Sequence, residues 1–277
     1  MANEIISGLK GLDTSGVEVD EEQVAPSIGL GSAEETAELA KMEALLQAAG
    51  VEADSDTKLL CLRGRKYDAE RAAGLLPKLL ELKGSLGCDG PAGAWMPQLV
   101  SDINSAKVMN TGAKDEGGRA IIWVRLRKHD PKVSKAEDMG RLLTTVMLSA
   151  LKDPEVQRHG VVVINDMSGL KLKNLDPAAA KNIMQNIFPK LPIRVGRIVI
   201  FNPPWIVGHV LLPVLLALMS KKLRGRIALV NGHHPEKITP FVPAASLPAE
   251  LDGTYALDEA KWSEALVATL PKAVEIS

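Results

Sequence analysis

The sequence Gly160-Val-Val-Val-Ile-Asn-Asp166 decides the fold class. Its four consecutive β-branched residues are typical of a strand that is covered on both faces of a parallel sheet. Further short strands are predicted over 120–126, 198–201 and 226–230, and longer segments with helical spacing or helix-capping residues separate the strands. Strands that alternate with helices indicate βαβ crossovers, so the sequence predicts an α/β fold with a mainly parallel sheet.

Helices between and after these strands are indicated by apolar spacing and capping residues. Apolar residues between Met139 and Ala150 recur with helical period. Asp176-Pro177 supplies a capping acid followed by a proline in the first turn. A strongly apolar helix is predicted from 205 to about 222, and a last amphipathic helix is predicted after Asp258.

The first part of the chain differs in charge. Residues 1–40 contain nine acidic residues and one basic residue, a net charge of −8, so the rest of the chain carries +7 and the total is −1. Residues 1–31 lack apolar periodicity and are predicted to be a disordered acidic tail. The balanced total excludes a nucleic-acid-binding mode that depends on bulk positive charge.

Residues 32–84 are predicted to form a small helical domain. Ser32 and Glu35 have the spacing of a capping box, and Asp56 and Asp68 have the character of caps for two further helices.

Breaker residues mark the end of this domain. Pro77 stands inside the helix expected after Asp68 and should kink or shorten it. Residues 85–117 are rich in glycine and polar residues, so the domain junction is predicted there and 118–277 are assigned to the α/β domain.

The chain lacks the short motifs of common catalytic and cofactor sites. It has no GxGxxG or GxxxxGK[ST] phosphate loop, no GxSxG nucleophile elbow and no HExxH metal motif. Cys61 and Cys88 form no CxxC pair, so neither a metal nor a cofactor is expected. His209 is expected to be a hydrogen-bonded core residue, whereas the neighbours His233 and His234 are expected at the surface.

No targeting or membrane-spanning segment is indicated. The N-terminal residues lack a basic region followed by an apolar one. The most apolar stretch, 210–219, contains Pro213 and is well short of the ~20 residues that span a bilayer. The sequence therefore predicts an intracellular protein.

Seven segments of the chain follow the order of a known family. They read LLCLRGRKYD (59–68), GRAIIWVRL (118–126), HDPKV (129–133), GVVVIND (160–166), RIVIFNPPW (197–205), RIALVNG (226–232) and LPAELDG (247–253). Together they cover about residues 33–255 and resemble the CRAL-TRIO family, which includes tocopherol-transfer, retinaldehyde-binding and phosphatidylinositol-transfer proteins. The resemblance implies a small helical domain followed by a CRAL-TRIO lipid-binding domain.

The resemblance also implies a carrier rather than a catalyst. In this family a sheet and helices enclose one lipid-sized cavity, and a mobile gate helix closes it and meets the membrane. Here the gate helix is expected at 205–222, and its apolar residues are Trp205, Val207, Val210, Leu211, Val214, Leu215 and Leu218. Apolar residues on nearly every side suit a helix that touches a lipid and then a bilayer, and equally a helix buried in the core.

Lipid-pocket residues follow from strand alternation and from the resemblance. Alternation groups Val161, Val163 and Asn165 on one strand face and Ile198 and Ile200 on another. The resemblance adds helix positions that face the cavity in the tocopherol-transfer branch, namely Leu143, Met147, Ile183 and Ile187. Because burial of an unpartnered polar group is costly, Asn165 is hypothesised to orient a polar end of the ligand.

Basic residues form a second group. The resemblance implies a phosphoinositide headgroup and membrane site made of Arg63, Arg65, Arg194, Arg197, Lys221, Lys222, Arg224 and Arg226. Clustered lysine and arginine beside an apolar helix suit an anionic membrane surface, and a solvated charged face is the alternative.

The sequence thus predicts a cytoplasmic, transiently membrane-associated monomer that transfers a hydrophobic lipid between membranes. The expected ligand is a tocopherol, retinoid, phospholipid or sterol-like lipid, and no nucleic-acid partner is expected. One alternative is a membrane-recruited adaptor that senses lipid without delivering it. Another is an α/β enzyme that acts on a small metabolite.

Overall fold

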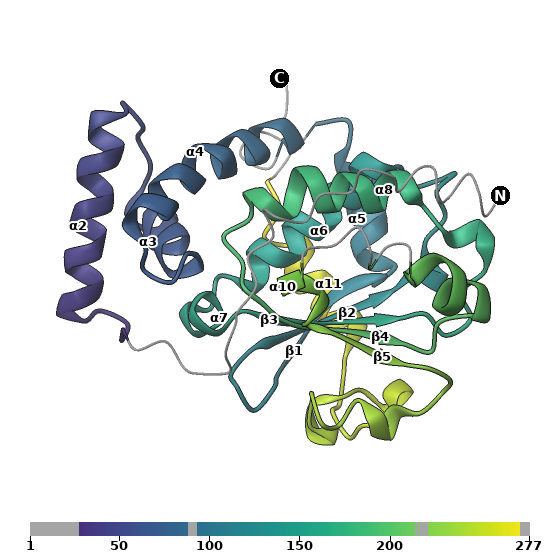
Figure 1. Cartoon of the computed structure of the whole chain (residues 1–277). Coiled ribbons are helices and arrows are strands. Elements are labelled where there is room, and N and C mark those ends of the chain that lie inside the picture. Colours follow the sequence, from purple (N-terminus) through teal and green to yellow (C-terminus); the bar gives the residue numbers. More distant parts are fainter. Residues whose placement is uncertain (1–27, 88–92, 214–215, 217–220, 272–277) are drawn as a thin grey trace.

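A five-stranded sheet organises the part of the chain that the computed structural model describes, namely residues 28–87, 93–213, 216 and 221–271 (Figure 1). The strand order is β1-β2-β3-β4-β5. β1 is antiparallel to β2, and all other neighbours are parallel, which confirms the predicted α/β class. The strands are β1 Val108–Lys114, β2 Ala120–Arg125, β3 Val161–Asp166, β4 Val195–Phe201 and β5 Ile227–Val230. Most of the predicted acidic tail, 1–27, lies outside the described residues.

Helices precede and connect the strands. The α-helices are α2 Ala33–Ala48, α3 Ser55–Gly64, α4 Ala69–Leu86, α5 Met96–Asn104, α6 Ala136–Ala150, α7 Pro154–His159, α8 Pro177–Asn182, α10 Lys221–Arg224 and α11 Glu259–Val267. Two π-helical turns occupy Ile183–Ile187 and Val207–Leu211. Short 3-10 turns occupy Leu126–Lys128, Leu172–Asn174, Phe188–Lys190, Pro235–Lys237, Ala244–Ser246 and Ala249–Leu251. Among the described residues, every helix is too short or too polar to cross a bilayer.

Both faces of the sheet are covered. Ile122 and Val163 point to one side and join a core with the helices, whereas Ile121 and Ile164 point to the other. Figure 1 shows α5, α6 and α8 above the sheet and the segment that follows β5 below it. This double cover explains the continuous β-branched run of β3, which has no solvent-facing side.

Local capping confirms most of the predicted helix starts. The Ser32 hydroxyl accepts a hydrogen bond from the Glu35 N–H, and the carboxylates of Asp68, Asp176 and Asp258 cap α4, α8 and α11 in the same way.

The prediction of Asp56 as a cap was wrong, because the Asp54 carboxylate accepts the bond from the Thr57 N–H at 2.8 Å. Asp56 instead adds an acidic group to the first turn, where it favours the helix dipole.

Two predicted interruptions differ from the structure. Helix α4 continues past Pro77, since its apolar side is buried through Leu75, Leu76, Leu79 and Leu82. The predicted junction 85–117 contains α5 and β1, and polar residues in β1 conceal its strand pattern. Gly112 has a positive φ and lies where the register of β1 against β2 shifts. Because β1 begins at Val108, the sheet begins ahead of the predicted domain start at 118.

Candidate ligand-binding cavity

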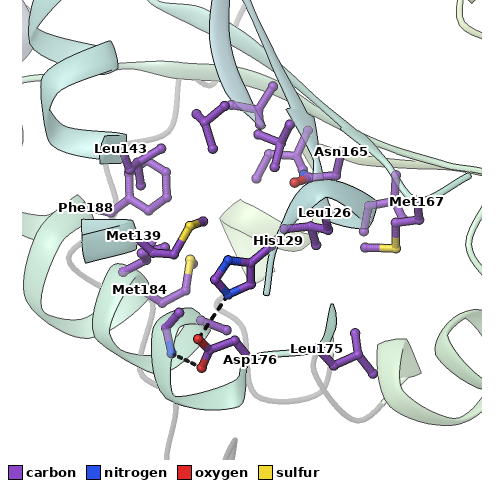
Figure 2. Close-up of a pocket in the computed structure, with 18 of the residues that line it drawn as sticks. Leu126, His129, Met139, Leu143, Asn165, Met167, Leu175, Asp176, Met184 and Phe188 are labelled. Carbon is purple, nitrogen blue, oxygen red and sulfur yellow. Dashed lines mark hydrogen bonds and ion pairs between the residues drawn. The ribbon is translucent and has the colours of Figure 1, made fainter. Parts of the chain in front are cut away.

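A cavity of about 290 Å³ lies between the helix-covered face of the sheet and the helices above it. Its volume is near the lower end of the ~300–1,000 Å³ that is typical of ligand pockets. Strand residues such as Val163 and Ile200 form one wall, and Met139 and Leu143 of α6 form another. Figure 2 shows Met139, Leu143 and Asn165 around an open space. The remaining lining side chains are mostly aliphatic, so the cavity suits an apolar molecule.

Most of the predicted pocket residues line this cavity. They are Leu143, Met147, Val163, Asn165, Ile183, Ile198 and Ile200. Val161 and Ile187 do not line it: both are fully packed in the surrounding core. Ile187 lies against α6, where Gly140 leaves room for its side chain. Contact of the lining residues with a lipid remains a prediction.

A polar group at the edge of the cavity was not recognised from the sequence. His129 is 2% exposed, and its Nε2 lies 3.2 Å from Oδ2 of Asp176. The other oxygen of Asp176 accepts the N–H of Ala179 at 2.8 Å, so the helix cap also holds the imidazole. Asn174 donates its amide N–H to the His129 carbonyl at 2.7 Å. The signal was present in the HDPKV segment and in the Asp176 cap, yet their pairing joins residues 47 positions apart.

The imidazole of His129 is held neutral. Burial is the largest cause and lowers its pKa from the ordinary value, and the hydrogen bond to Asp176 opposes that shift only in part. A neutral imidazole carries one N–H and one lone pair.

Asn165 lines the cavity together with Val163 and Ile198, and Figure 2 shows its side chain at the open space. It is half-buried, and its side-chain amide has no hydrogen-bond partner among the described residues. Its amide is therefore available to a bound molecule, as the hypothesis for this residue requires.

The predicted gate helix is described only in part. Residues from 205 to 213 are helical and include a π-helical turn. Val207 lines the cavity, whereas Trp205 is 70% exposed. The side chains of Val210 and Leu211, and all of Val214, Leu215 and Leu218, lie outside the described residues.

His209 was predicted to lie in the core, and that prediction was wrong. It is exposed, its ring stacks on Trp205 at 5.4 Å between centroids, and its Nδ1 lies 3.1 Å from the Trp205 carbonyl oxygen. Neither ring is among the side chains that line the cavity. His233 and His234 are exposed, as predicted.

Three of the predicted headgroup residues are buried and form no part of an exposed surface. Arg63 pairs with Glu35, Arg65 donates to the Pro189 carbonyl, and Arg194 donates to the Arg63 carbonyl. These arginines join the helical domain to the α/β domain, which corrects their assignment to a membrane site.

The other basic residues lie nearer the surface. Arg197 is half-buried over the ring of Phe241, at 4.8 Å from the ring centroid. Lys221 and Arg224 are exposed, Arg226 is half-buried, and the side chain of Lys222 lies outside the described residues. Membrane contact by this group remains a prediction.

Two features of the described part of the chain concern nucleophilic and metal chemistry. Burial raises the pKa of the Cys61 thiol to about 12, so the reactive thiolate is not formed at neutral pH. Within the described ranges, no three histidine, cysteine, aspartate or glutamate residues are grouped as metal ligands.

Comparison with known proteins gives a consistent result. A family model described as the CRAL/TRIO domain matches residues 104–253, more than half of the chain. Tyrosine-protein phosphatase non-receptor type 9 from Homo sapiens is 27% identical over 203 residues, which cover 73% of this chain and 33% of that protein. Clavesin-1 from Rattus norvegicus is 26% identical over 158 residues, covering 56% of this chain and 44% of its own length. Clavesin-2 from Homo sapiens is 27% identical over 157 residues, which cover 55% of this chain and 47% of that protein.

The chain therefore spans between a third and a half of the length of these relatives. The matched segment contains all five strands and every described residue that lines the cavity. CRAL/TRIO domains bind hydrophobic lipids, which agrees with the apolar walls. Because the match covers the sheet, the cavity and more than half of the sequence, the chain belongs to the CRAL/TRIO domain family.

Proposed function

We propose that the chain is an intracellular, non-catalytic carrier that binds one hydrophobic lipid in the cavity and transfers it between membranes. The observation that carries this proposal is the composition of the cavity wall. Its described lining is apolar except for His129, Asn165, Asn174 and Asp176. Such a wall replaces the acyl chains of a bilayer as the surroundings of the lipid, so that apolar surface stays out of water during transfer.

The segment that follows β4 supplies a route for exchange. Val207 and Leu212 face the cavity, whereas Trp205 of the same segment is exposed. A single short segment therefore touches both the ligand space and the solvent. Tryptophan favours the interfacial layer of a bilayer, so we infer that Trp205 meets the membrane when the cavity opens.

Basic side chains near this segment suit an anionic membrane. Lys221 and Arg224 are exposed at α10, where the predicted gate helix 205–222 ends. Each base near an anionic surface contributes ~1 kcal/mol to binding. The proposal includes binding of phosphoinositide headgroups. Arg197 of β4 and Arg226, the residue before β5, are the further bases proposed to bind them.

A transfer assay tests the carrier function. Donor vesicles of total cellular lipid and acceptor vesicles of phosphatidylcholine are incubated with the protein, and mass spectrometry identifies the lipids that reach the acceptor. Ala180 lines the cavity and Ala178 is exposed on the same helix. Ala180→Phe fills the ligand space and should reduce transfer about tenfold, whereas Ala178→Phe should leave it near the wild-type rate.

The outcomes separate the possible functions. Enrichment of a lipid on the protein together with its appearance in the acceptor supports the carrier. A lipid that binds but never moves would favour a lipid-sensing adaptor. Absence of bound lipid from the wild type, or equal transfer by both variants, would contradict the proposal. Asn165→Ala in the same assay should change which lipid is carried, because that variant removes the free amide from the wall.

A further inference from the structure

One nitrogen atom in the cavity lining is buried without a partner. Nδ1 of His129 has no hydrogen-bond partner among the described residues, and the side chain is 98% removed from solvent. Figure 2 shows the imidazole with Asp176 on one side and the open space bounded by Met139, Leu143 and Asn165 on the other. A buried polar atom without a partner costs free energy. A ligand group that forms a hydrogen bond with this nitrogen would remove that cost.

The hydrogen-bonding role of this nitrogen follows from its neighbours. Asp176 accepts the Ala179 N–H through one oxygen and faces Nε2 of His129 with the other. A carboxylate accepts hydrogen bonds, so Nε2 carries the proton and donates it. In the neutral imidazole Nδ1 then has a lone pair and no hydrogen.

The ring is also fixed in position. The His129 N–H donates to the Leu126 carbonyl at 3.0 Å, and the His129 carbonyl accepts from Asn174 at 2.7 Å. Asp176 is anchored by the start of α8. The lone pair is therefore presented to the cavity by a held side chain, which is the condition for selective recognition.

We propose that His129 Nδ1 accepts a hydrogen bond from a hydroxyl group of the ligand, so that the cavity selects compact hydrophobic alcohols. The proposal rests on the carrier function proposed above and names the chemical class of its cargo. An alcohol donates its O–H to Nδ1, whereas an aldehyde, an ether or an ester of the same skeleton has no hydrogen to donate. A site built for a ligand hydroxyl discriminates against analogues that lack it, because the acceptor is left unpaired.

The size of the cavity points in the same direction. About 290 Å³ accommodates a compact apolar skeleton, and a small ligand gains a large share of its selectivity from one directed hydrogen bond. The apolar walls bind the skeleton without regard to its end group, so the alcohol and its analogues differ at His129 and Asn165.

Three matched probes test the proposal on the purified full chain: farnesol, farnesyl methyl ether and farnesal, with dissociation constants from calorimetry. The wild type should bind the alcohol about tenfold or more tightly than the ether. His129→Phe keeps an apolar ring without the lone pair, and the ratio of the two affinities should fall to about one.

Asp176→Asn provides a sharper variant, because asparagine caps helices as well as aspartate does. Its amide oxygen accepts the Ala179 N–H, and its NH₂ group then faces Nε2 of His129. Nε2 becomes the acceptor, so the proton moves to Nδ1, which now donates. This variant should lose the preference for the alcohol and favour the aldehyde, a reversal that a merely structural role of Asp176 would not produce.

Each affinity ratio compares two probes bound to the same variant. A change of cavity shape that affects both probes equally therefore cancels from the ratio. If the wild type binds all three probes equally, the carrier function stands and the acceptor role of His129 is wrong. If it binds none of them, the selection of compact alcohols is wrong, and the vesicle transfer assay decides the carrier function separately. A preference for the alcohol that persists in both folded variants would also overturn the inference, and the wild-type ratio decides the matter if a variant fails to fold.

Discussion

The carboxylate of Glu35 accepts two hydrogen bonds from the guanidinium of Arg63, at 2.7 Å to Oε1 and 2.9 Å to Oε2. Both side chains are buried, and Glu35 also accepts the Gly31 N–H at 2.7 Å. Arg63 reaches Gln157 of α7 with its other terminal nitrogen. The pair therefore joins α2 to α3, and the hydrogen bond from Arg63 to Gln157 joins α3 to the α/β domain.

Glu35→Ala should lower the free energy of unfolding by roughly 3–5 kcal/mol, because it leaves the buried guanidinium of Arg63 without its counter-charge. Chemical denaturation followed by circular dichroism measures the change. Glu38→Ala on the same helix is the control: it removes a surface pair with Lys41 and should cost no more than about 1 kcal/mol. Equal losses in the two variants would show that burial of the Glu35 pair adds nothing.

This pair marks the limit of what the sequence predicts. Strands and caps were recognisable because their signals are local, as in the β-branched run of β3 or the Ser32 cap. The burial of Arg63 and Arg194 depends on contacts with residues 28 and 131 positions away, and a basic residue gives no local sign of such a partner. Sequence reasoning therefore assigned both to the surface.

The close approach of α3 to the α/β domain predicts a second effect. A methyl group on Gly64 would lie 2.4 Å from the Pro192 carbonyl oxygen, whereas one on Gly74 of α4 would meet nothing within 4 Å. Gly64→Ala should destabilise the fold by about 1–3 kcal/mol through overpacking. Gly74→Ala should stabilise it by about 0.5–1 kcal/mol, since alanine favours an exposed helix interior. Thermal unfolding of the two variants gives the signs, and a stable Gly64→Ala protein would contradict this tight contact.

Prediction of the cavity shows a similar limit. Val161 and Val163 share one face of β3, and both are apolar, so alternation alone assigns them the same role. Val163 lines the cavity, whereas Val161 is packed in the core with side chains from other elements. Which of the two lies at open space depends on side chains from distant segments.

Membrane docking through the exposed part of the gate segment is expected to need both an aromatic and a basic component. Trp205→Ala should weaken binding to vesicles that contain phosphatidylserine by removing an exposed interfacial anchor. Replacing Lys221 and Arg224 by alanine together should cost about 2 kcal/mol, or about thirtyfold in affinity. Vesicle flotation measures both effects.

Vesicles without anionic lipid and a variant at a second exposed base provide the controls for docking. The loss caused by the double variant should disappear with pure phosphatidylcholine vesicles, whereas the loss caused by Trp205→Ala should persist. Lys78→Ala removes an exposed base on α4, outside the gate helix and α10, and should leave binding unchanged. A Lys78 variant that binds as weakly as the double variant would mean that overall charge, rather than this surface, drives docking.

The lowered pKa values of two histidines predict how the stability of the fold depends on pH. Burial is the largest cause that lowers the pKa of His129, and it also lowers the pKa of His159. In the unfolded chain both regain an ordinary pKa near 6.5. As the pH falls below that value, the unfolded state takes up protons that the folded state does not, so the folded state loses stability until the lower folded pKa is reached.

The protein should therefore unfold at a lower temperature at about pH 5.5 than at about pH 7.5, with ~1.4 kcal/mol lost for each unit by which a folded pKa is depressed. Carboxylates with lowered pKa, such as Glu35, act below this window, because their ordinary values are already near 4.5. His129→Phe and His159→Gln each remove one titrating group, so each should reduce the difference between the two melting temperatures. A His129→Phe protein with the full wild-type difference would mean that the buried imidazole keeps an ordinary pKa in the folded state, which would contradict its depression by burial.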